Sequence, residues 1–171
     1  MKRKYNKNVI NIDINEENVY ADYGIDGDLL VEEDLIDNMF NVANTRPIKQ
    51  GVIFCFKEKN GIDVEDSKFI SAYHNTIKNH LLSKKLEIRR CILLGVVLLV
   101  ASALFILLEN FFFIKQGPII AEVSNIISWV FFWAAVEVLT IDLSQLMMEK
   151  IKYIRLDEAI LLFNRNKKDT D

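Results

Sequence analysis

The sequence predicts a membrane protein: a two-span α-helical transmembrane hairpin with a small cytoplasmic α+β N-terminal domain. Three observations lead to this fold class: two long apolar runs, basic residues concentrated before the first run and after the second, and a polar first half with short alternating patterns. Overall, 51% of the 171 residues are hydrophobic and 26% are charged. Those averages are typical of a globular domain, but the apolar residues are concentrated in the second half of the chain.

Residues 1–88 show the patterns of a small α+β domain. In "NVINIDI" the isoleucines alternate with polar residues, which predicts a strand, and "NVYADYGI" can form a second. "VEEDLIDNMFNVAN" has apolar residues at helical spacing with acids at its start, so we expect a helix there. "GVIFCF" predicts a buried strand, and the apolar stripe from Phe69 to Leu81 predicts another helix. A domain of this size has a marginal core, so we expect it to lean on a partner, another copy or the C-terminal tail.

The two apolar runs predict two membrane spans. Residues 92–108 carry no charge, and residues 119–141 carry only Glu122 and Glu137. Each run is long enough for a hydrocarbon core of about 30 Å at about 1.5 Å per residue. We therefore expect a first transmembrane helix over 89–113, a short extracytoplasmic loop over 114–118 and a second transmembrane helix over 119–141.

Basic residues predict the orientation of this hairpin. Lysine and arginine in short flanking segments favour the cytoplasmic side. One basic residue, Lys115, lies between the spans, whereas several flank the outer ends of the two runs: Lys78, Lys84, Lys85, Arg89, Arg90, Lys150, Lys152 and Arg155. We expect a multi-pass protein of the cell (inner/plasma) membrane with both termini cytoplasmic.

The C-terminal segment 142–171 is expected to continue the second span as a cytoplasmic helix. Its apolar residues keep helical spacing from Leu143 to Ile154. The stretch "AILLFNR", within 157–165, fits either more helix or a strand that joins the N-terminal sheet. Consecutive apolar residues favour the strand.

Glu137 poses the main question of the second span, because a carboxylate in lipid is costly. In an antiparallel hairpin, residues whose numbers add up to about 230 lie at the same depth. Glu137 then lies about one turn deeper than Arg89 and Arg90. We expect these arginines to act as orientation and ion-pair anchors for Glu137, near the cytoplasmic boundary.

A polar stripe through both spans is the alternative setting for Glu137. Small and polar residues at helical spacing are typical of helix–helix contacts in membranes. Such a stripe could join the two spans to each other, join two copies, or line a channel in a closed ring with acids at its outer mouth. Its members on the two spans are Gly95, Ser102, Glu109, Glu122, Asn125, Trp129, Trp133 and Glu137.

An acidic segment precedes the spans. Residues 8–45 contain ten acids and no lysine or arginine. This predicts either a solvated face or a docking surface for a basic partner, with Asp26, Asp28, Glu32, Glu33 and Asp34 as candidates. The stretch "DYGIDGDLLVEE" resembles a calcium loop only in part, because its third position is Gly24. We predict no metal, no cofactor and no catalytic residues, since hydrolase, phosphate-loop and zinc-protease motifs are missing from the sequence.

Two function classes remain. The first is a non-enzymatic membrane anchor or scaffold whose acidic cytoplasmic domain binds a protein partner or self-associates at the inner membrane surface. The second is an oligomeric ion channel or membrane-disrupting effector gated by that domain. We expect the lipid bilayer as a partner. Either class favours a homo-oligomer or a protein partner on the cytoplasmic side, and the net charge of −3 argues against nucleic acid. The Asn-, Ile- and Lys-rich composition is typical of an AT-rich bacterial genome.

Overall fold

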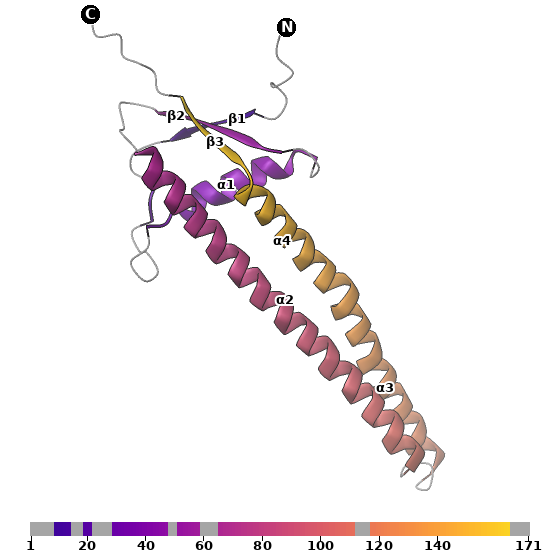
Figure 1. Cartoon of the computed structure of the whole chain (residues 1–171). Helices are drawn as coiled ribbons and strands as arrows, with labels where there is room; N and C mark the ends of the chain where they lie inside the picture. Colours follow the sequence, from indigo (N-terminus) through magenta and orange to yellow (C-terminus); the bar gives the residue numbers. More distant parts are fainter. Residues whose placement is uncertain are drawn as a thin grey trace, which may run out of the picture. The chain divides into compact units, whose positions relative to one another are not determined.

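The computed structural model describes residues 9–14, 19–21, 29–47, 51–58, 65–111 and 117–164. The chain is mostly helical, with two helices long and apolar enough to cross a membrane and one small sheet (Figure 1). It divides into two compact units: residues 1–82 together with 151–171, and residues 83–150.

The first unit is a parallel three-stranded sheet with helices packed against it. The strands β1 (Val9–Ile14), β2 (Ile53–Glu58) and β3 (Ile160–Asn164) lie in the order β1-β2-β3, and both pairs are parallel. Helix α1 (Glu33–Asn44) connects β1 to β2 (Figure 1). A parallel pair needs such a crossover, so the expected α+β domain is instead a small α/β domain.

The core of this unit lies between the sheet and the helices. Ile10, Ile12 and Ile14 of β1 are buried, as are Phe54 and Phe56 of β2. The helices contribute most of the other members of the same cluster: Ile36, Met39, Ala43, Phe69, Ala72, Tyr73, Ile77, Tyr153 and Leu156. Residues 153 and 156 come from the end of the chain, so the C-terminal segment completes the N-terminal domain.

Helix α2 (Asp66–Phe111) contains both the expected apolar stripe from Phe69 to Leu81 and most of the residues expected to form the first span. The 46 residues form one helix, because no glycine or proline lies between Asp66 and Gly95 to end it. The expected strand over "NVYADYGI" falls largely outside the described residues. Within it, Tyr20 forms an isolated antiparallel bridge with Val31.

The second unit is a helical hairpin. After α2, helix α3 (Pro118–Glu137) begins at proline, preceded by Gly117 with φ of 131°. That backbone conformation favours glycine, and proline suits the first helical position. The helix continues through a π-helical turn, η4 (Val138–Asp142), into α4 (Leu143–Asp157). The second apolar helix therefore runs unbroken from Ile119 to Asp157.

Candidate functional site

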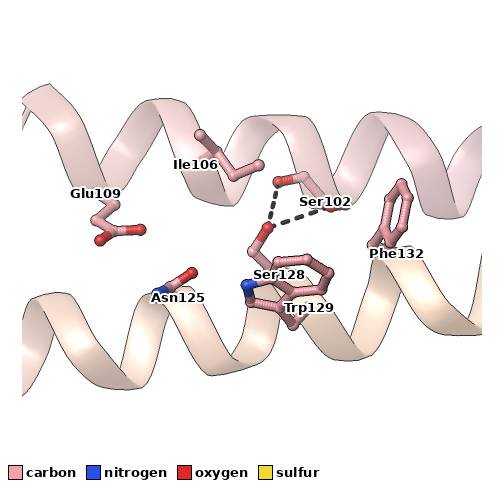
Figure 2. A pocket seen from close by; sticks show the side chains of 7 residues that line it. All are labelled: Ser102, Ile106, Glu109, Asn125, Ser128, Trp129 and Phe132. Carbon is pink, nitrogen blue, oxygen red and sulfur yellow. Dashed lines mark hydrogen bonds between the residues drawn. The ribbon is translucent and has the colours of Figure 1, made fainter.

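Small hydroxyl side chains join α2 to α3. Ser128 Oγ donates a hydrogen bond to the carbonyl oxygen of Ser102 at 3.0 Å, and the two hydroxyl oxygens lie 3.2 Å apart (Figure 2). One turn away, Ser124 Oγ donates to the carbonyl oxygen of Phe105 at 3.4 Å. All three serines are buried. Backbones approach closely where side chains are this small, so these serines define the face on which the helices meet.

Gly95 plays the same role toward the other end of the hairpin. A Cβ atom at residue 95 would overlap the side chain of Leu139 in η4. Cys91 Sγ donates to the carbonyl oxygen of Val138 at 3.4 Å. These contacts join residues whose numbers add up to about 230, as expected for an antiparallel hairpin. The π-helical turn therefore packs against Gly95 and Cys91 of α2.

An ion-pair cluster links the same two chain segments beyond Cys91. Lys84 Nζ lies 2.9 Å from Glu149 Oε2 and 2.9 Å from Glu87 Oε2. The Glu149 carboxylate, assisted by Glu87, raises the pKa of the Lys84 ammonium above its ordinary value. This lysine stays charged at any physiological pH and holds α2 beside α4 within the hairpin unit.

Five larger residues of α3 lie outside the buried contact between the two helices. We call them the α3 stripe: Glu122, Asn125, Trp129, Trp133 and Glu137. All five are exposed, and the two tryptophans are exposed by 54% and 61%. Gly95 and Ser102 of the expected stripe are instead buried between the helices, and Glu109 is half-buried. The structure thus separates two sets of residues that the sequence pattern had grouped.

Residue size explains this separation. Ser124, Ser128 and Ala135 are spaced by four and seven residues on α3, and all three are buried. A tryptophan on that face would push the helices apart, whereas these side chains allow close packing. The spacing of small residues on the second span was the sequence signal for the hairpin interface, and the polar pattern was not.

Two grooves flank Trp129 on the exposed side of the hairpin. The first, of about 350 Å³, has Glu109 of α2 and Asn125 of α3 in its lining (Figure 2) and is formed by Ser102, Ile106, Glu109, Asn125, Ser128, Trp129 and Phe132. The second, of about 600 Å³, is formed on α3 alone by Ile126, Trp129, Val130, Trp133, Ala134 and Glu137. The indole of Trp129 is thus a ridge between two hollows.

Glu137 is not paired as expected. Within the described residues, no ion pair joins its carboxylate to Arg89 or Arg90, and all three side chains are exposed. Glu137 lines the groove formed by α3 alone, so it faces away from α2. The expected anchoring of Glu137 by these two arginines is therefore not formed within the hairpin.

The acidic candidates divide between described and undescribed positions. Glu33 and Asp34 lie in the first turn of α1 and are exposed, and Glu32 immediately precedes the helix. Carboxylates there interact favourably with the helix dipole. Asp26 and Asp28 lie outside the described residues. The described acids therefore stabilise the start of α1 and leave two carboxylates on the surface.

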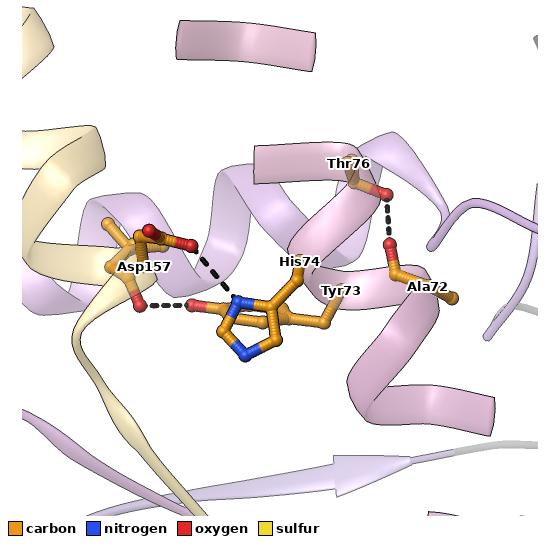
Figure 3. A network of polar contacts seen from close by, with 6 residues as sticks. Ala72, Tyr73, His74, Thr76 and Asp157 are labelled. Atoms are coloured by element: carbon orange, nitrogen blue, oxygen red, sulfur yellow. Dashed lines mark hydrogen bonds and ion pairs between the residues drawn. The ribbon is translucent and has the colours of Figure 1, made fainter. Parts of the chain in front are cut away.

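A polar network ties α2 to the chain end within the first unit. Tyr73 Oη donates to the carbonyl oxygen of Leu156 at 2.8 Å, and His74 Nδ1 lies 3.0 Å from Asp157 Oδ1 (Figure 3). Burial raises the pKa of the Tyr73 phenol above its ordinary value, with a smaller contribution from the Asp157 charge. Thr76 Oγ1 donates to the carbonyl oxygen of Ala72 and accepts the Val31 N–H.

Arg155 performs a similar task at the end of α1. Its buried guanidinium donates through Nη1 to the carbonyl oxygens of Ala43 and Arg46, each at 3.2 Å. A cation at a helix C-terminus interacts favourably with the helix dipole. Across the described ranges, no three His, Cys, Asp or Glu side chains gather in a group that could hold a metal ion.

Comparisons of the chain with protein-family models, with curated proteins and with solved structures found no match.

Proposed function

We propose that this chain is a non-enzymatic integral membrane scaffold that self-associates within the cell membrane through the α3 stripe. Its first unit, with both chain ends, lies in the cytoplasm and presents a binding surface there. The observation that carries the proposal is the exposure of carboxylates, an amide and two indoles along one side of α3, whose other exposed side chains are apolar.

The exposure of the apolar side chains supports a membrane location. In the most apolar windows of the two helices, only 17% and 11% of the residues are buried. A core helix of a soluble protein would be mostly buried. Leu93, Val97 and Val130 are each more than half exposed, which suits lipid contact, and the basic residues at the outer ends of both runs support the inside orientation of the termini.

The cost of polar groups in lipid supports self-association. A charged side chain at the centre of a bilayer costs about 2.5–3.5 kcal/mol or more. Asn125 and the indole N–H groups of Trp129 and Trp133 also need hydrogen-bond partners in lipid. The other side of α3 is already packed against α2. A second copy in the same membrane can provide the hydrogen-bond partners that the α3 stripe needs.

Energy transfer between labelled full-length chains in liposomes tests this proposal. Asn125→Leu should weaken association about 5- to 30-fold, because an asparagine contact in a membrane contributes about 1–2 kcal/mol. Val123→Leu is the matched control, since Val123 is exposed on α3 but lies off the stripe. Equal energy transfer in the Asn125 variant, the control and the unchanged chain would contradict self-association through the stripe.

A channel is the second candidate, and the exposure of Glu122, Asn125 and Glu137 is the observation that favours it. In a closed ring these side chains would face a pore and favour cations. Trp129 and Trp133 occupy the same stripe near mid-span, and their bulk suits packing between helices better. Cation flux into liposomes that is altered by Glu122→Gln and Glu137→Gln would establish the channel. Liposomes that contain associated protein but pass no cations would remove it.

A further inference from the structure

The sheet of the first unit has one face without a covering layer among the described residues. Side chains alternate along each strand, and those opposite the core form three rows across the sheet, given by the strand register. We call this the open face; its rows are Val9, Ile53 and Ile160, then Asn11, Cys55 and Leu162, then Asp13, Lys57 and Asn164. Ile160 and Leu162 are 56% and 49% exposed.

The topology explains why the helices leave this face bare. Crossover connections between parallel strands are right-handed in nearly all proteins. Both crossovers here step in the same direction across the sheet, from β1 to β2 and from β2 to β3. Their helices therefore cover the same face. Parallel sheets in proteins are normally covered on both faces, so the open face is half of an interface.

The sequence next to the two edge strands of the sheet is polar. The stretches that adjoin the strands and lie outside the described residues are polar and rich in lysine and asparagine: "MKRKYNKN" before β1 and "RNKKDTD" after β3. A polar composition is a poor match for an apolar face, which favours a surface on another molecule.

The size of the face selects a second copy as that molecule. Three strands and about five residues per strand make a surface of roughly 240 Å², from strand spacing and rise. A stable complex between free proteins needs about 800 Å² on each partner. A face this small binds weakly. It stays occupied only if the partner is already tethered nearby, where its effective concentration is about millimolar. Copies anchored in one membrane meet that condition.

The row pattern also fits a copy of itself. With antiparallel stacking about an axis between the first two rows, Ile160 lies over the partner's Leu162, Ile53 over the partner's Cys55 and Val9 over the partner's Asn11. The third row, in which Asp13 is the register partner of Lys57, then falls at the solvated rim. The apolar side chains of the two rows meet, Asn11 lies on the edge strand β1, and the charged residues keep their water, as in ordinary protein interfaces.

We propose that the open face docks against the same face of a second copy, which closes the sheet into a two-layer sandwich between tethered protomers. This inference rests on the proposed self-association for the tether but uses a different surface of the chain. It makes the cytoplasmic unit the place where two protomers recognise each other.

Cys55 provides a native probe at the centre of the open face. The chain has two cysteines, and Cys91→Ser leaves Cys55 as the only thiol while keeping a donor for the Val138 carbonyl oxygen. A bismaleimide of about 10 Å, the spacing of packed sheets, should link two full-length chains in liposomes. Leu162→Glu should lower the yield about tenfold, because it would bury an unpaired carboxylate. Ile70→Glu is the control, at an exposed isoleucine on α2 in the same unit.

Each outcome bears on the inference. A Cys55 dimer that Leu162→Glu abolishes and Ile70→Glu leaves intact supports it. Energy transfer between protomers without any Cys55 dimer overturns the docking of open faces and leaves association through the α3 stripe intact. If Cys55 of the Cys91→Ser variant is instead linked to a different protein in native membranes, that protein, and not a second copy, covers the open face. Loss of both signals would contradict the proposed function as well.

Discussion

Gly95→Val tests which faces of α2 and α3 meet, and the exposure of the α3 stripe depends on that answer. A Cβ atom at residue 95 would overlap both Cγ and a Cδ atom of Leu139. Rotation about χ2 of Leu139 moves only its Cδ atoms and leaves Cγ in place. Relief therefore requires a different χ1 rotamer of Leu139, a separation of the two helices, or a rearrangement of the π-helical turn.

The magnitude follows from competing terms. Overpacking of a close contact costs about 1–3 kcal/mol. Valine has a better helix propensity than glycine by about 0.3–0.4 kcal/mol, which offsets a small part of this cost. The net loss of about 0.6–2.7 kcal/mol corresponds to a roughly 3- to 100-fold change in the equilibrium between the closed and opened hairpin. Ala103→Val, at an exposed position on the same helix, should change it by no more than about 0.5 kcal/mol.

The assay is equilibrium opening of the hairpin in mixed micelles of increasing sodium dodecyl sulfate. A fluorescent pair on the outward faces of α2 and α3 reports the distance between the helices in the full-length chain. Gly95→Val should open at a lower detergent fraction than the unchanged chain, whereas Ala103→Val should not. If both variants open at the same detergent fraction, Gly95 does not lie against Leu139. The assignment of the α3 stripe to the exposed side of α3 would then be wrong.

Three further predictions concern contacts outside the apolar helix segments, and hydrogen exchange of the full-length chain in nanodiscs can check each of them. Arg155→Met should destabilise the first unit by about 3 kcal/mol, because two carbonyl groups at the end of α1 lose a charged donor; unchanged protection of α1 would refute this. Tyr73→Phe should cost about 1 kcal/mol at pH 7 through the lost bond to Leu156. Burial raises the pKa of the Tyr73 phenol in the folded chain, so on raising the pH the phenol of the unfolded chain loses its proton first. The contribution of Tyr73 to folding stability is therefore complete below a pH of about 10 and is lost as the pH rises further. The Phe variant should lack that alkaline loss. Lys84→Met should loosen α2 from α4 by no more than about 1 kcal/mol, since the Glu149 carboxylate is 44% exposed, and 1 M salt should erase the difference between variant and unchanged chain.

Local patterns were sufficient for the elements themselves. The uncharged run 92–108 and the run 119–141 predicted the two long apolar helices, because a segment in lipid must satisfy its own backbone hydrogen bonds and a helix does so. The alternation of Ile10, Ile12 and Ile14 predicted β1 and its buried face in the same way. Both signals are carried by neighbours in the sequence, so no distant contact was needed to interpret them.

Other features depended on residues far apart in the chain. The strand over 160–164 pairs with β2, more than 100 residues earlier, and four apolar residues in a row fit helix and strand equally well. The parallel direction of the sheet, which changes the expected α+β domain into α/β, depends on the same pairing. The position of Arg155 at the end of α1 likewise follows from the way the chain end returns to the first unit.

The candidate site shows the same division between sequence and tertiary structure. The sequence by itself identified Gly95, Ser102, Asn125, Trp129 and Glu137 as exceptional residues in apolar surroundings, because the cost of a polar group or the loss of a side chain in such a run is a property of single positions. Only the tertiary structure decided which of them meet across the hairpin and which remain exposed. That choice depends on the combined size of side chains from both helices at the same depth, and neither helix specifies it alone.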